Sequence, residues 1–81
     1  MITYNYEVKG MNLQTPFFID YVTRQARESK FFGLEASVSA RSSDALLVEL
    51  SHGDSKGIQK FVDWLKSASK GASKVRSIRK L

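Results

Sequence analysis

The chain has 81 residues, of which 42% are hydrophobic and 26% charged, with 13 basic and 8 acidic side chains. This length allows one hydrophobic core, and the composition is too apolar for a disordered segment. The lack of cysteine excludes disulfides and thiolate metal sites, and no apolar run approaches the roughly 20 residues that span a bilayer. The start of the chain lacks the basic and apolar regions of a signal peptide. We therefore predict a single cytoplasmic domain over residues 1–81 that has no contact with membranes.

The net charge of +5 arises entirely from the C-terminal end of the chain. Residues 1–69 hold eight basic and eight acidic side chains, whereas residues 70–81 hold five basic side chains and no acid. These five are Lys70, Lys74, Arg76, Arg79 and Lys80. Such a cluster can attract a polyanion, or it can keep an edge strand from pairing with another chain. We favour the second interpretation.

The first half of the chain predicts a strand and a helix. Residues 2–9 alternate between apolar and polar side chains, which indicates a half-buried strand that ends at Gly10. Thr15 and Pro16 are typical of the N-cap and the first position of a helix. One apolar stripe follows them, and the helix should end before Gly33.

The second half predicts two strands and a second helix. The strands cover residues 34–41 and 45–51 and are joined by a turn. The helix begins after a cap at Asp54 or Ser55, and its tail ends at Gly71.

A last strand is predicted over residues 75–81. The element order is then strand–helix–strand–strand–helix–strand, which is the ferredoxin-like split βαβ arrangement. Two amphipathic helices would cover one face of a four-stranded antiparallel sheet, and the other face would remain open to solvent. The sequence therefore predicts an α+β sandwich.

Three short motifs, spread over most of the chain, resemble those of one enzyme family. They are Phe32-Gly33-Leu34 before the second strand, Phe61-Val62-Asp63-Trp64-Leu65 in the second helix, and Ala72, Val75 and Ile78 in the last strand. Together they resemble the acylphosphatases. That resemblance implies the ferredoxin-like fold and the hydrolysis of acyl phosphates without metal or cofactor.

The positions that carry acylphosphatase chemistry are not matched. In the family the first turn reads Val-Gln-Gly-Val-Gly-Phe-Arg, and its backbone N–H groups and arginine hold the phosphate. Here the run is Leu13-Gln14-Thr15-Pro16-Phe17-Phe18-Ile19, so Thr15 and Phe17 replace the glycines and Ile19 replaces the arginine. Ala40 occupies the place of the asparagine that positions the attacking water.

The resemblance therefore implies the family scaffold without its two catalytic side chains. We predict a small non-catalytic domain that uses no cofactor or metal, acts by binding a protein or an anion, and is a monomer or weak dimer. One alternative is an acylphosphatase with an anion site rebuilt from Gln14, Thr15 and Arg41 at the helix N-terminus. A second alternative is weak binding of nucleic acid or another polyanion by the five basic side chains of residues 70–81.

Five other residues have competing interpretations. His52 is the only histidine, and without a second ligand it is expected to be an exposed turn residue. Tyr4 and Tyr6 are expected under the helices, where they could not stack on RNA bases. Phe17 and Trp64 are expected at the edge of the core, although full exposure would make either of them an anchor for a protein partner.

Overall fold

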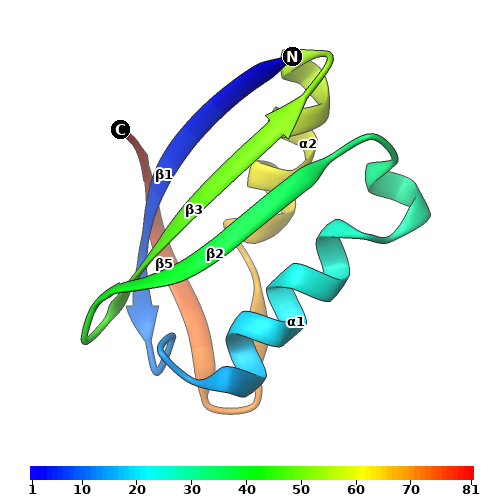
Figure 1. Cartoon of the computed structure of the whole chain (residues 1–81). Coiled ribbons are helices and arrows are strands. Elements are labelled where there is room, and N and C mark those ends of the chain that lie inside the picture. The colour runs from blue at the N-terminus through cyan, green and yellow to red at the C-terminus, as the bar shows by residue number, and fades with distance from the viewer.

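The computed structural model describes residues 1–81 and contains two α-helices and one five-stranded antiparallel sheet (Figure 1). In chain order the elements are β1 (Ile2–Met11), α1 (Pro16–Ala26), the 3-10 helix η1 (Ser29–Phe31), β2 (Glu35–Ser42), β3 (Ala45–His52), α2 (Ser55–Leu65), β4 (Ser69–Lys70) and β5 (Ser73–Lys80). The strands lie in the order β2-β3-β1-β5-β4. The predicted α+β class is therefore confirmed.

The prediction of four strands is wrong, because β4 is a fifth, two-residue strand that pairs with β5. The sequence also predicted a tail of α2 that ends at Gly71, whereas α2 ends at Leu65. Gly71 instead occupies the turn between β4 and β5 with φ of 59°, a left-handed conformation that glycine adopts without steric cost. As a result β5 begins at Ser73 and not at Val75.

Alternation along the strands separates the sheet into a face covered by helices and an open face. Tyr6 and Val8 of β1 are buried together with Leu46, Val48 and Leu50 of β3. Both helices lie on this side of the sheet (Figure 1), where α1 packs against β2 and α2 against β3. Each fully buried large apolar side chain contributes about 1.5–3 kcal/mol, so this face supplies most of the stability.

The caps predicted for both helices are confirmed. The Thr15 hydroxyl accepts a hydrogen bond of 3.1 Å from the backbone N–H of Phe18, and Pro16 is the first helical residue. The Asp54 carboxylate accepts a hydrogen bond of 2.9 Å from the backbone N–H of Lys56. Both α-helices have 11 residues, and none of the helices combines the length and the apolar character that crossing a membrane requires.

A β-bulge explains why Val75 and Ile78 are three residues apart and still face the helices. The register between β1 and β5 shifts between Lys9 and Gly10, which leaves Arg76 as an extra residue on β5. Val75 is 3% exposed, and Ile78 packs against the core from the same side. The irregular spacing in the sequence is therefore a consequence of this bulge.

His52 is a half-buried structural residue at the end of β3, so the prediction of an exposed turn position is wrong. Its Nδ1 accepts a hydrogen bond of 2.9 Å from the backbone N–H of Asp54. The neutral ring therefore carries its proton on Nε2, which donates to the carbonyl oxygen of Phe32 at 3.1 Å. Gly57 makes room for the ring, because a Cβ there would lie 2.4 Å from Nε2.

Candidate anion-binding surfaces

The turn from β1 to α1, where the resemblance places a phosphate site, is built from side chains that stabilise the fold. The Thr15 hydroxyl is used as the helix cap. Leu13 is fully buried, and Ile19 packs against the core as a partly buried residue. Gln14 is exposed. This turn therefore presents no cationic side chain of its own to an anion.

The two positions at the end of β2 lie on different faces of the sheet. Ala40 is paired with Leu46 and lies on the helix-covered side. Arg41 lies at a second register shift, and its Nε is 2.9 Å from a carboxylate oxygen of Glu7 on the open face. No hydrogen bond or ion pair joins Arg41 to Gln14 or Thr15.

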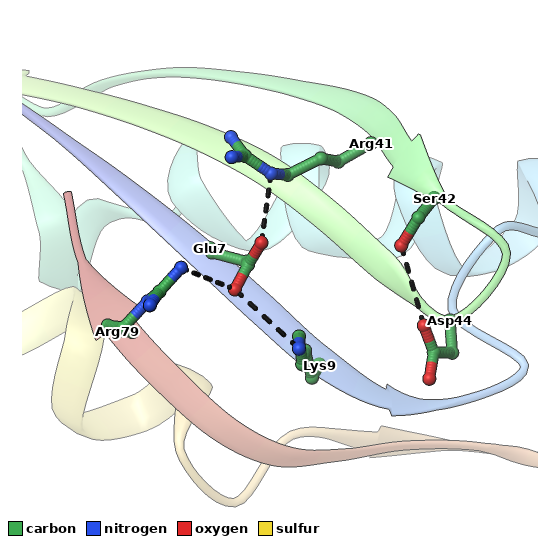
Figure 2. Close-up of polar contacts among 6 residues, drawn as sticks. All are labelled: Glu7, Lys9, Arg41, Ser42, Asp44 and Arg79. Atoms are coloured by element: carbon green, nitrogen blue, oxygen red, sulfur yellow. Dashed lines mark hydrogen bonds and ion pairs between the residues drawn. The ribbon is translucent and has the colours of Figure 1, made fainter.

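Glu7 is the centre of a group of cations on the open face (Figure 2). Its side chain is only 11% exposed, and its two oxygens contact Arg41 Nε at 2.9 Å, Arg79 Nη2 at 3.1 Å and Lys9 Nζ at 3.9 Å. We call these four residues the Glu7 cluster. Three cations share one carboxylate, so the cluster carries a net charge of about +2 at neutral pH.

The topology of the sheet explains how this cluster forms. Glu7 lies in the middle of the central strand β1, where it pairs with Arg79 of β5 and with Leu47 of β3. Lys9 follows two residues later on the same face, and Arg41 reaches across β3 (Figure 2). A largely buried carboxylate requires such partners. Sequence analysis did not single out Glu7, although an acid in the middle of the first strand was the available clue.

The five basic side chains of residues 70–81 lie on two different sides of the sheet. Arg79 belongs to the Glu7 cluster. Lys74 precedes the buried Val75, so alternation places it on the open face. Arg76 is the extra residue of the bulge, and its contact of 2.9 Å with the sulfur of Met11, two residues after Lys9 on β1, places it on the same face. Together with Lys9 and Arg41, these three residues form what we call the open-face cation surface.

The other two lysines lie over tyrosine rings on the helix side. Lys70 Nζ is 5.2 Å from the ring centroid of Tyr21 in α1, and Lys80 Nζ is 3.5 Å from that of Tyr4. Both distances fall within the range of cation–π attraction. The basic segment is therefore divided between the two sides of the sheet.

Of the two aromatic residues considered as anchors for a protein partner, only Phe17 is exposed. Trp64 is half-buried and packs against Tyr21 and Phe61 with ring centroids 5.7 and 5.2 Å apart, which confirms its expected place at the edge of the core. Phe17 is 84% exposed, so the same expectation is wrong there. It borders a hollow of about 530 Å³ beside the turn between β4 and β5.

Comparisons of this chain with protein-family models, with curated proteins and with solved structures find no significant match. The resemblance to acylphosphatases therefore stays a prediction from short motifs.

Proposed function

We propose that this chain is a ferredoxin-like binding domain that does not hydrolyse acyl phosphates and that binds a phosphate polyanion through the open-face cation surface. Apart from the two-residue β4, the element order is strand–helix–strand–strand–helix–strand, which supports the ferredoxin-like part of the proposal. The charge on the open face supports the binding part. The side chains of the first turn serve the core and the helix cap, which supports the absence of hydrolysis.

The single observation that carries the proposal is the composition of the Glu7 cluster. Its three cations are between 42% and 69% exposed, whereas the carboxylate they share is 11% exposed. Glu7 fixes the guanidinium groups of Arg41 and Arg79 through one nitrogen each. The remaining nitrogens of Arg41 point away from Glu7 (Figure 2), and a guanidinium fork of this kind suits phosphate oxygens.

Two further cations extend this surface along β5. Lys74 and Arg76 make no ion pair within the chain. A row of cations with few acids is the electrostatic pattern of proteins that bind nucleic acid through its backbone. Because contacts with phosphate carry no sequence information, we expect little preference for base sequence.

Hydrolysis of acyl phosphates requires charge neutralisation on the phosphate oxygens. Ile19 occupies the arginine position and packs against the core, and the Thr15 hydroxyl is used by the helix cap. Arg41, the nearest cation in the sequence-based alternative, binds Glu7. No other group in this turn replaces the rate enhancement that a preorganised cation would supply.

Binding is tested by fluorescence anisotropy with a labelled single-stranded oligonucleotide over a range of salt concentrations. The logarithm of the association constant should fall linearly with the logarithm of the salt concentration, by about 0.7 per phosphate contacted. Replacing Arg41, Lys74 and Arg76 with glutamine should weaken binding by at least about tenfold and reduce the slope by about 2.

The matched control replaces Arg27, Lys30 and Lys60 with glutamine. Arg27 is the C-cap of α1, Lys30 lies in η1 and Lys60 lies in α2, so the substitution removes the same amount of charge from the helix side. An equal loss of affinity in both triple variants would show that only net charge matters, and the proposed surface would then be wrong.

The absence of hydrolysis is tested with acetyl phosphate at neutral pH. We expect no turnover above the spontaneous rate, because no side chain of the first turn can neutralise the phosphate. Turnover that disappears in Gln14→Ala or in Arg41→Gln would contradict this expectation and would support the rebuilt anion site.

A second candidate function is the binding of a protein partner at Phe17. It is favoured by the 84% exposure of that ring and by the adjacent hollow of about 530 Å³, since exposed aromatic side chains often anchor interfaces. A photoreactive residue at position 17 should then form more crosslinks with a partner than one at position 60. Equal yields would argue against this function.

A further inference from the structure

A groove of about 570 Å³ lies on the helix side of the sheet, between α2 and the pair β1 and β5. Its volume is within the range of small-molecule sites in proteins, about 300–1,000 Å³. The floor contains aromatic and aliphatic side chains, and the rim contains lysines. The floor includes Tyr4, Tyr6, Val62 and Ile78, and the lysines of the rim are Lys56, Lys66 and Lys80.

Tyr6 supplies the observation that points to a ligand. It is 7% exposed, and its hydroxyl makes no hydrogen bond to another group of the chain, whereas every fully buried polar side-chain atom does have a partner. The hydroxyl therefore keeps access to the groove that Tyr6 lines. Burial and the neighbouring Tyr4 raise the pKa of Tyr6 above 10.0, so at neutral pH the group is a proton donor.

All charged side chains that line the groove are positive. Three lysines and no carboxylate line it. Because Ile2 pairs with His52, the start of α2 lies beside the start of β1, and Lys56 is at that end. Lys80 is at the same end, because its Nζ is 3.5 Å from the Tyr4 ring centroid.

The opposite end of the groove differs in charge. At a rise of 1.5 Å per residue, Lys66 lies about 15 Å further along the helix than Lys56. It is also 3.5 Å from the carboxylate of Asp63, which neutralises it in part. Val62 and Ile78 lie between the two ends. The groove therefore combines one cationic end that has a free hydroxyl donor with an apolar middle section.

We propose that this groove binds a small phosphate monoester. Its phosphate lies between Lys56, Lys80 and the Tyr6 hydroxyl, and its apolar group lies along Val62 and Ile78. A phosphate monoester carries a charge of about −1.5 to −2 at pH 7, which matches two ammonium groups better than the single charge of a carboxylate does. The groove and the open-face cation surface lie on opposite sides of the sheet, so this inference does not rest on polyanion binding.

The probe is phenyl phosphate, titrated into the full chain and followed by backbone amide shifts in NMR and by calorimetry. The shifts should be largest at residues 4–6, 55–62 and 78–80. Inorganic phosphate lacks the apolar group and phenylacetate lacks the second charge, so both should bind at least about tenfold more weakly. Shifts concentrated on the open face, or equal affinities for the three anions, would overturn the proposal.

Two substitutions test the contacts of the phosphate. Tyr6→Phe and Lys80→Gln should each raise the dissociation constant for phenyl phosphate by about tenfold, the effect of losing one hydrogen bond to a charged group. Tyr21→Phe and Lys60→Gln are the matched controls, because they remove the same groups outside the groove, and they should leave the constant unchanged. If controls and groove variants weaken binding equally, or if no saturable binding occurs, the proposal is wrong.

Discussion

Glu7 is the residue through which three strands are linked on the open face, because its carboxylate contacts cations from β1, β2 and β5. Glu7→Gln should therefore lower the free energy of unfolding by about 1–2 kcal/mol, since a charged hydrogen-bond acceptor with little solvent access is lost. Urea denaturation measures this change. Glu49→Gln is the control, because Glu49 is exposed and makes no ion pair, and it should change stability by less than about 0.5 kcal/mol.

Tyr6 should make the stability of the chain depend on alkaline pH. The pKa of its phenol in the folded chain is raised above 10.0 by burial and by Tyr4, so the unfolded chain loses the proton first as the pH rises. The stabilising contribution is complete below about pH 10 and is lost as the pH rises through the folded-state pKa. Urea denaturation between about pH 9 and 11 should show this decrease, and Tyr6→Phe should reduce it. An unchanged decrease in Tyr6→Phe would contradict the assignment.

At the level of residues, sequence could identify the groups whose roles are local. The caps Thr15 and Asp54 were predicted because each bonds to a backbone N–H within three residues. The roles of Glu7 and His52 were missed, because Glu7 binds Arg79, 72 residues away in the chain, and His52 bonds to Phe32, 20 residues away. Spacing along one segment carries no information about such partners.

At the level of elements, the ladder between β1 and β5 requires a glycine at position 10. A Cβ on Gly10 would lie 2.1 Å from the carbonyl oxygen of Lys74, which belongs to the backbone and has little freedom to move. Gly10→Ala should therefore reduce the free energy of unfolding by about 2–3 kcal/mol, as overpacking does. Gly53→Ala is the control, because its Cβ would meet nothing within 4 Å. Equal stability of the two variants would contradict this account of the bulge.

The longer elements were predictable because periodicity accumulates over eight or more residues, as in β1, β3 and both helices. Strand β4 could not be found in this way, because two residues have no period. Gly71 was interpreted as the end of a helix, since helix termini and tight turns both use a glycine with positive φ. The wrong end was therefore predicted for α2 because a glycine in the sequence can indicate either a helix end or a tight turn.

At the level of the whole molecule, both candidate sites assemble from segments that are distant in the sequence. The Glu7 cluster takes residues from three strands, and the groove takes them from β1, α2 and β5. Sequence analysis found the excess of charge in residues 70–81 but assigned it to a single strand edge. The fold divides that charge between two surfaces, and only the three-dimensional arrangement shows which cations act together.

The bulge at Arg76 accounts for the irregular spacing of the core-facing residues in β5. Deleting that one residue while the pairing of β1 is kept would remove the bulge and leave Val75 and Ile78 two residues apart, so ordinary alternation would still direct both toward the helices. The bulge thus accommodates one extra residue without changing which side chains of β5 reach the core. Insertion of a single residue should be tolerated at the turn around Gly71, which lies before the bulge on the surface, and deletion of Arg76 should be tolerated as well.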